Sequence, residues 1–415
     1  MTAVVDSRVA GTGRECPVES LDFVLASGGR RIEATRAQDL HLPPVAEAGA
    51  RAVARQAMRA LDGSTDALVC GMVPFDPAQP PDLFLARDVR RHQLPPATER
   101  TPVPVAAPSD PSPSGGSSSG AVPQDAGHED AGYRAAVAEV LRRIDRNQVR
   151  KVVLARSLEL DVAGLDLDLV WRLLLDRTRH GYVYAVRTRQ GRMLGASPEL
   201  IAGVDDAGLH SRPLAGSLPR GTSAGDDAAN ARRLTGSAKD VAEHRFVVDD
   251  IARRLAPLVA RLQVPARPQL VRTDAMMHLG TDLLATPRPG VGALEAALTI
   301  HPTPAVCGTP TDAALPLIRD LEAVPRGYYA GLVGWTDHRG HGEWALALRC
   351  AAIEAGRARL FAGAGVVAGS RPAGELAETA AKLRTMIAAF TAARRIGALT
   401  DTADSNVADR PGASR

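Results

Sequence analysis

The sequence predicts an α/β protein of the α+β kind, in which helices and antiparallel strands follow one another without regular alternation. The chain has 415 residues, of which 45% are hydrophobic, and this is enough apolar material for one large core or two ordinary ones. Strand-like segments are joined to each other by glycine turns as well as to helical segments, which favours hairpins over repeated βαβ units.

The N-terminal part of the chain shows two strand patterns around one helical pattern. Residues 23–36 and 67–76 read as strands. Between them, residues 46–63 have the apolar spacing of an amphipathic helix and end at a glycine, the residue that most often follows the last turn of a helix.

A composition break then divides the chain. The segment "TPVPVAAPSDPSPSGGSSSGAVPQDAGHED" (101–130) is dense in proline, serine and glycine and cannot bury much apolar area. We therefore predict the following parts: a flexible N-terminus (1–15), the N-terminal part of the fold (16–98), a disordered linker or loop (99–130), the catalytic region (131–395) and a flexible tail (396–415).

Further elements are predicted after the break. Residues 225–258 read as two helices, or as one helix broken at Gly236. The other helical patterns are at 133–148 and 167–177, and the strand patterns are at 151–160, 182–188, 192–204, 327–337, 342–356 and 357–369.

Charge and composition exclude several classes of function. The net charge is +3, without a basic cluster, so neither a nucleic-acid nor a membrane partner is predicted. The four cysteines are far apart and form no CxxC pair, which argues against a disulfide scaffold or a zinc site. No signal peptide or membrane-spanning run is present in the sequence, and a cytoplasmic protein is expected.

One C-terminal stretch, "GELAETAAKLRTM" (374–386), places charged side chains at helical spacing. Residues three and four positions apart share one face of a helix, so Glu375, Glu378 and Lys382 are expected to project from the same side. Taken alone, this pattern is also typical of a solvated surface helix.

A second stretch, "SAKDVAEHRFVVDD" (237–250), repeats the arrangement with Asp240, Glu243 and His244. Carboxylates from two such helices would suit Mg²⁺, a hard cation that binds oxygen atoms and keeps several waters. Lys382 could then hold an anionic group of a substrate beside the metal.

Seven motifs, in this order along the chain, resemble the chorismate-utilising enzymes, which include anthranilate, aminodeoxychorismate, isochorismate and salicylate synthases. The likeness covers residues 133–392, and residues 23–36 and 71–86 extend it weakly to the N-terminal part of siderophore-type isochorismate synthases. The motifs are "VRKVVLAR" (149–156), "GASPEL" (195–200), "RPLAGSLPRG" (212–221), "SAKDVAEH" (237–244), "HPTPAVCG" (301–308), "GWTDHRGHGEWALALRC" (334–350) and "FAGAGVVAGSRPAGELAETAAKL" (361–383).

This resemblance implies one large domain of two packed antiparallel β-sheets, flanked by helices, with the active site in a central cleft. It also bears on the nucleophile. Ammonia-using anthranilate synthases usually carry glutamine where Lys151 stands, and aminodeoxychorismate synthases carry a reactive lysine where Ala215 stands. Lys151 together with Ala215 is the pattern of the members that add water to chorismate, and "HPTPAVCG" is more similar to the isochorismate synthases.

The implied reaction adds water at C2 of chorismate and expels the C4 hydroxyl, which requires a base and an acid. The resemblance assigns the base to Lys151 and the acid to Glu199, whose pKa must then be raised. Substrate-binding roles are implied for Ala215, His278, Thr303, Arg349, Gly363 and Lys382.

The same resemblance implies an Mg²⁺ cofactor. Glu243 and Glu378 would bind the metal, while Asp240 and Glu375 would hold its waters. Arg349 would clamp the enolpyruvyl carboxylate through its planar fork, and a monomer without an obligatory glutaminase partner is expected.

Three alternatives stay open. A salicylate synthase makes the same intermediate and then eliminates pyruvate, and it shares nearly every residue named above. An ammonia-using subunit of the anthranilate synthase kind would be expected to lack Lys151. A catalytically inactive relative would be expected to have lost some of these acids and bases. The product could serve siderophore biosynthesis, which the N-terminal likeness favours, or menaquinone or a specialised metabolite.

Overall fold

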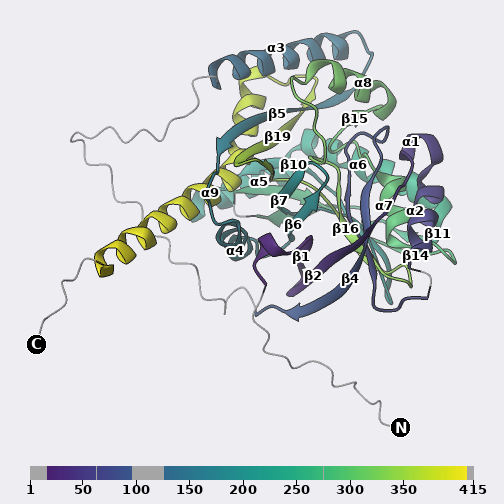
Figure 1. The fold of residues 1–415 in the computed structure, drawn as a ribbon. Helices are drawn as coiled ribbons and strands as arrows, with labels where there is room; N and C mark the ends of the chain where they lie inside the picture. The colour runs from purple at the N-terminus through teal and green to yellow at the C-terminus, as the bar shows by residue number, and fades with distance from the viewer. Residues whose placement is uncertain (1–15, 62, 96–125, 274, 409–415) are drawn as a thin grey trace, which may run out of the picture.

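The computed structural model describes residues 16–61, 63–95, 126–273 and 275–408. They form a mixed α/β fold in which every strand pair described is antiparallel, so the predicted fold class is confirmed (Figure 1). The strands divide unequally between two sheets, sixteen in one and three in the other.

The large sheet has the order β11-β14-β9-β8-β17-β16-β3-β4-β2-β1-β6-β7-β18-β19-β5-β15, and the small sheet has the order β10-β13-β12. The strands are β1 (Phe23–Ser27), β2 (Arg30–Asp39), β3 (Leu68–Val73), β4 (Asp82–Gln93), β5 (Lys151–Asp161), β6 (Tyr182–Thr188), β7 (Gly191–Ser197), β8 (Leu200–Asp205), β9 (Gly208–Arg212), β10 (Leu214–Pro219), β11 (Val259–Gln263), β12 (Gln269–Arg272), β13 (Met276–Gly280), β14 (Leu283–Pro287), β15 (Gly308–Thr309), β16 (Leu332–Thr336), β17 (Gly342–Leu346), β18 (Cys350–Glu354) and β19 (Arg357–Val367).

The helices lie around the sheets (Figure 1). They are α1 (Val45–Ala48), α2 (Ala50–Arg59), α3 (Ala126–Asp145), α4 (Leu167–Arg177), α5 (Ala224–Gly236), α6 (Ala238–Leu255), α7 (Ala293–Ile300), α8 (Thr311–Leu321) and α9 (Pro372–Ala408), with short 3₁₀ turns at Val18–Ser20 and Ala256–Leu258. None of the described helices is long and apolar enough to cross a membrane.

Helix boundaries agree with the sequence at Gly236 and differ elsewhere. The single helix predicted over 46–63 is divided at Gly49, which has a φ of 80°, into α1 and α2, and it ends at Arg59 rather than at Gly63. The break predicted at Gly236 is present, because α5 ends there and α6 begins directly after Ser237. Helix α3 begins at Ala126, inside the range expected to be a linker, and α9 continues to Ala408, past the expected boundary at 395. The continuation has a simple cause, since no proline interrupts the chain between Pro372 and Pro411.

Part of the predicted division of the chain lies outside the described residues. This holds for the N-terminus (1–15), most of the linker (96–125) and the last residues of the tail (409–415). The division into these parts therefore stays a prediction.

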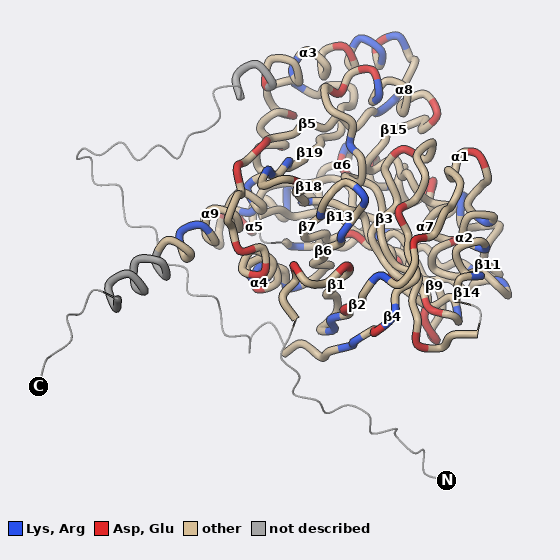
Figure 2. Tube along the Cα trace, viewed as in Figure 1, with Lys and Arg blue, Asp and Glu red and all other residues tan. Residues whose placement is uncertain are grey.

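The central strands of the large sheet are buried on both faces, which explains their nearly continuous apolar sequences. In β6, Tyr184 and Val186 belong to one core cluster, while Val183 and Ala185 belong to another. Helices α4 and α9 pack over the second cluster, beside β6, β7 and β19. Acidic and basic residues are interspersed along the described chain (Figure 2).

Candidate active site

A cavity of about 170 Å³ lies where β5, β10, β13 and β19 meet the first turns of α6 and α9. We call it the central cavity. It is lined by every residue of the predicted site except Thr303, namely Lys151, Glu199, Ala215, Asp240, Glu243, His278, Arg349, Gly363, Glu375, Glu378 and Lys382. Residues that are up to 231 positions apart in the sequence thus meet in one place, although which roles they perform is still a prediction.

Lys151 is the first residue of β5, and its side chain is buried beside α6. Its Nζ donates to Glu243 Oε1 at 2.7 Å, and Lys151 is only 7% exposed. Burial by itself would raise the pKa of Glu243, but the charge and hydrogen bond of Lys151 outweigh that effect, so this pKa lies below its usual value. The pair places one amine and one carboxylate in direct contact within the cavity.

Space for this pair comes from the neighbouring strand. In the antiparallel register of β5 and β19, Val153 is opposite Gly365, and therefore both residues face the cavity, as Lys151 does. A Cβ atom at Gly365 would lie 3.0 Å from Lys151 Cε and 3.4 Å from Glu243 Oε1. Glycine at position 365 leaves the room that the lysine side chain occupies, and the sequence prediction did not include it.

Helix α9 brings Glu375, Glu378 and Lys382 to the cavity on one face, as their helical spacing predicts. Lys382 Nζ donates to Glu378 Oε1 at 2.7 Å and to the carbonyl oxygen of Gly363 at 2.9 Å. Burial raises the pKa of Glu375, and the nearby negative charge of Glu378 raises it further. This part of the cavity therefore holds more carboxylate charge than its lysine neutralises.

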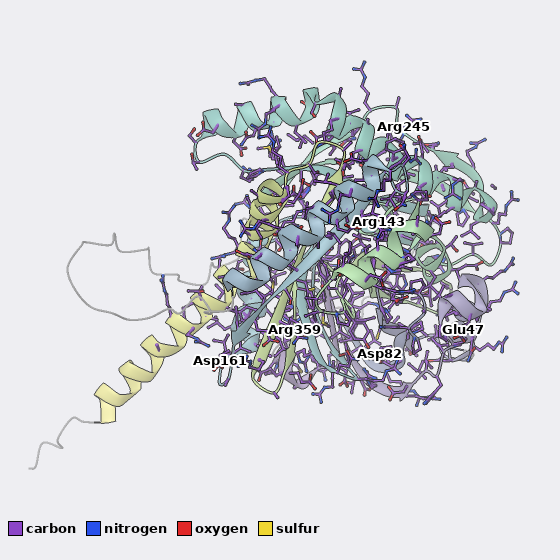
Figure 3. All side chains as sticks on the ribbon, turned by 90° about the horizontal axis from the view of Figure 1, so that it is seen from above. Glu47, Asp82, Arg143, Asp161, Arg245 and Arg359 are labelled. Atoms are coloured by element: carbon purple, nitrogen blue, oxygen red, sulfur yellow. The ribbon has the colours of Figure 1, made fainter. Side chains whose placement is uncertain are left out.

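Helix α6 brings the second acidic cluster to the cavity because of how it starts. Ser237 caps the helix, and its hydroxyl accepts a hydrogen bond from the backbone N–H of Asp240 at 3.2 Å. Asp240 and Glu243 then line the cavity, whereas Arg245, labelled in Figure 3, is exposed and pairs with Asp249 at 2.8 Å. Asp240 and Glu243 therefore face the cavity, whereas the Arg245–Asp249 ion pair of the same helix is exposed to solvent.

Glu199 lies in the short connection between β7 and β8 and is 3% exposed. Its Oε1 has no hydrogen-bond partner among the described residues. Burial raises the pKa of Glu199 to about 8, and the backbone N–H of Leu214 and the cations Lys151 and Arg349 offset only part of this shift. At neutral pH the carboxyl group is mostly protonated, so it can donate a proton.

His278 is held neutral between two partners. A guanidinium group can only donate, so Arg349 Nη2 donates to His278 Nε2 at 2.8 Å. The imidazole proton is then on Nδ1, which donates to Ser217 Oγ at 2.7 Å. Burial and the charges of Arg349 and Lys382 hold the pKa of His278 well below its usual value, in agreement with this arrangement.

The backbone at Arg349 has an uncommon conformation. Its φ of 43° lies in the left-handed region, which residues other than glycine seldom adopt. The carbonyl oxygen of Arg349 accepts from the N–H of Ala196 at 3.1 Å, which ties this residue to β7 next to Glu199. Such local strain is often found where a side chain must be presented to a ligand.

Strand β10 forms another wall through an irregularity. The register with β13 shifts between Ala215 and Ser217, and Gly216 between them has a φ of +73°. This bulge lets four consecutive residues, 214–217, line the cavity, which a regular strand with alternating sides would not do. Ser217 is a further site residue that the sequence prediction did not include.

Thr303 is the one predicted site residue that does not line the central cavity. It is fully buried, and its carbonyl oxygen accepts hydrogen bonds from the N–H groups of Val306 and Cys307. Its neighbours Ala305 and Val306 do line the cavity. Thr303 thus shapes the loop that forms this wall, and a direct contact with substrate stays a prediction.

Carboxylate oxygens in this cavity have the chemistry of an Mg²⁺ site. Glu243 and Glu378 come from different helices and both line it. Each accepts a hydrogen bond from a lysine, and no three His, Cys, Asp or Glu side chains in the described part of the chain are arranged to hold a metal ion. A metal ligand role for Glu243 and Glu378 therefore stays a prediction, and a bound cation would have to replace the two lysines as their partners.

Another cavity in the structure is larger than the central cavity. A cavity of about 820 Å³ lies beside β9 and β14, but it contains none of the predicted site residues. The central cavity is distinguished by its chemistry, because it combines a neutral carboxylic acid, a buried lysine, an arginine fork and several carboxylates. Such a set can move protons in both directions while holding an anion.

The chain is similar to known proteins of one family. The chain matches a family model described as chorismate binding enzyme over residues 107–391. It is 43% identical over 267 residues to isochorismate synthase DhbC of Bacillus subtilis (strain 168), covering 62% of this chain and 67% of that protein.

Two further comparisons cover more of the chain. The vibriobactin-specific isochorismate synthase of Vibrio cholerae is 37% identical over 348 residues, which are 82% of this chain and 83% of that protein. The crystal structure of a candidate 2,3-dihydroxybenzoate-specific isochorismate synthase, DhbC from Bacillus anthracis, superposes with a TM-score of 0.78 at 31% identity, covering 90% of this chain and 98% of that one.

Proposed function

The chain belongs to the chorismate binding enzyme family, and we propose that it is an Mg²⁺-dependent isochorismate synthase that serves siderophore biosynthesis. The relatives named above are isochorismate synthases, and two of those names refer to vibriobactin and to 2,3-dihydroxybenzoate. One structural observation supports the proposal most strongly. A carboxylic acid that is neutral at pH 7, Glu199, lines the same cavity as the buried amine of Lys151.

The reaction leaves the atomic composition of chorismate unchanged, because one water enters and one water leaves. Water adds at C2, the ring double bonds shift, and the C4 hydroxyl leaves as water. Lys151 is an ammonium in its pair with Glu243, so it first has to release a proton to solvent. Its amine then accepts a proton from the attacking water, and Glu199 donates its proton to the departing hydroxyl. The product is an isomer of the substrate, and exchange with solvent restores both groups to their starting protonation states.

Binding of the substrate is assigned to the cations of the cavity. Arg349 presents two N–H groups to the enolpyruvyl carboxylate, and its bond to neutral His278 fixes the direction of the fork. Gly363 lets the Tyr329 hydroxyl approach β19 closely, since a Cβ atom at this position would lie 3.1 Å from Tyr329 Oη. We assign a second anionic group of the substrate to Lys382, whose Nζ donates to the carbonyl oxygen of Gly363.

We assign the metal to carboxylates of α6 and α9. Glu243 and Glu378 would hold Mg²⁺, with Asp240 and Glu375 binding its waters. When bound, Mg²⁺ would neutralise the ring carboxylate of chorismate and withdraw electron density from the ring. A cytoplasmic location, a monomeric state and independence from a glutaminase are further expectations from the sequence.

Product analysis tests this proposal. Purified protein is incubated with chorismate and Mg²⁺, and the products are separated by chromatography while free pyruvate is assayed with lactate dehydrogenase. We expect isochorismate without stoichiometric pyruvate. Fluorescent salicylate formed together with pyruvate would instead identify a salicylate synthase, and no consumption of chorismate would contradict both activities.

A further inference from the structure

A second cavity, of about 440 Å³, adjoins the central cavity and is rich in arginine. We call it the arginine cavity. Its basic lining residues come from separate segments, namely Arg177, Arg179 and His180 at and after the end of α4, Arg220 after β10, Arg272 at the end of β12, and Arg349 before β18.

The two cavities share part of their walls. Pro198 and Arg349 line both of them, and Pro198 is the residue directly before the proposed acid Glu199. At the other side, Arg179 and Arg272 are exposed to solvent. The arginine cavity therefore extends from the surface of the molecule to the residue that we assign to the substrate's enolpyruvyl carboxylate.

The charge in this cavity is largely of one sign. Among its described lining residues there is no Asp or Glu. The nearest carboxylate that pairs with them is Asp227 of α5, which accepts from Arg220 at 2.6 and 3.1 Å and lies 3.8 Å from Arg272. One carboxylate thus pairs with two arginines, while Arg177 and Arg179, which come from the end of α4 and the segment after it, have no such partner among the interactions described.

We propose that the arginine cavity is the entrance by which a small dicarboxylate substrate reaches the central cavity, with Arg177 and Arg179 attracting it electrostatically before Arg349 binds it. This inference rests on the proposed function, since chorismate carries two carboxylates. Clefts lined by one sign of charge concentrate ligands of the opposite sign, and they raise the rate of association. Arg177 and Arg179 act at long range, and Arg349 makes the contact.

The test compares a double variant with a matched control. Arg177→Gln/Arg179→Gln removes two charges at the entrance, while Arg55→Gln/Arg59→Gln removes two exposed charges on α2, outside both cavities. Values of kcat and kcat/KM for chorismate are measured for both variants and for the wild type at ionic strengths of about 10 mM and about 1 M. The Debye length falls from about 30 Å to about 3 Å between these conditions.

At low ionic strength we expect kcat/KM of the entrance variant to be about tenfold below that of the wild type, with less than about twofold change in kcat. At high ionic strength the difference should shrink below about twofold, because salt screens the lost attraction. The control variant should match the wild type in both conditions.

Two results would overturn the proposal that the arginine cavity is the entrance. One is a kcat/KM equal to that of the control at low ionic strength, and the other is a loss of the same size at both ionic strengths, which would indicate a local structural effect. Thermal melting of each variant identifies misfolding. The proposed function is judged separately, from whether the wild-type protein makes isochorismate in the same assay.

Discussion

Glu199 illustrates, at the scale of one residue, how surroundings determine a chemical role. It is an ordinary glutamate in the sequence motif "GASPEL", and nothing in its immediate neighbours specifies its protonation. In the fold it is 3% exposed, and one of its oxygens has no hydrogen-bond partner in the part of the chain that the structure describes. Burial raises its pKa to about 8. The sequence could identify the residue through family resemblance, whereas the cause of its acidity is visible only in the structure.

Replacing Glu199 with glutamine should remove the acid while keeping the side chain's shape. We expect kcat to fall by about 10²-fold or more, in the range that general acids contribute. In the wild type, kcat/KM should decline as pH rises through about 8, because the acid is then ionised. A pH profile of both proteins checks this, and a variant with wild-type kcat would rule out Glu199 as the acid.

The same raised pKa has a consequence for stability. A group whose pKa is higher in the folded state contributes stability at low pH, and that stability is lost as pH rises through the folded-state value, here about 8. Between pH of about 6 and about 9 the wild type should lose on the order of 3 kcal/mol of unfolding free energy at this group. Urea unfolding at both pH values should show a smaller loss in Glu199→Gln, and equal losses would contradict the burial argument.

Lys151 is the second residue on which the account depends. Lys151→Ala should abolish water addition, lowering kcat by about 10²-fold or more, while chorismate still binds. Lys151→Arg keeps a positive charge beside Glu243 but cannot release its proton, so it should be equally inactive. Turnover assays together with calorimetric titration of chorismate separate catalysis from binding, and unchanged turnover in the arginine variant would exclude Lys151 as the base.

At the scale of elements, the pairing of β5 with β19 creates the space that the Lys151 side chain occupies. The spacing of Glu375, Glu378 and Lys382 was predictable, because helical periodicity within one segment determines which residues share a face. The role of Gly365 was not, because it depends on which residue of β5 is opposite it, and the sequence of one strand does not specify its register with another. Ser217 was missed for a similar reason, since its position depends on a bulge in β10.

Gly365→Ala tests this pairing directly. Its added methyl group would lie 3.0 Å from Lys151 Cε, so the lysine must move, and we expect kcat to fall about tenfold or more with little change in melting temperature. The matched control is Gly236→Ala at the end of α5, where a Cβ atom meets nothing within 4 Å. Equal activity of the two variants would show that the position of Lys151 does not depend on this glycine.

Helices α6 and α9 supply the proposed metal ligands from two directions. Glu378→Gln removes one charged oxygen donor and should raise the dissociation constant for Mg²⁺ by at least about tenfold. Calorimetric titration with Mg²⁺ measures this, and Glu354→Gln, an exposed carboxylate at the end of β18, is the control. If Glu378→Gln and the control bound Mg²⁺ with equal affinity, the metal would lie elsewhere.

At the scale of the whole molecule, the sequence predicted the mixed fold with antiparallel strands but not the arrangement that produces the two cavities. Helices α7 and α8 and the small sheet β10-β13-β12 were not predicted. Helix α7 is almost entirely apolar, α8 contains Pro316, and the three strands are only four to six residues long. The arginine cavity could not be predicted either. Its residues come from segments far apart in the chain, and no basic cluster exists in the linear sequence.

The central claim is that carboxylates from α6 and α9 bind one divalent ion beside Lys151. Anomalous diffraction from crystals soaked in Mn²⁺ tests this most directly, since Mn²⁺ takes the same oxygen ligands as Mg²⁺ and can be located by its scattering. We predict a single strong peak in the central cavity, with Glu243 and Glu378 as ligands and the Lys151 ammonium displaced from Glu243. A peak outside that cavity, or a peak that only one of the two helices contacts, would contradict the account.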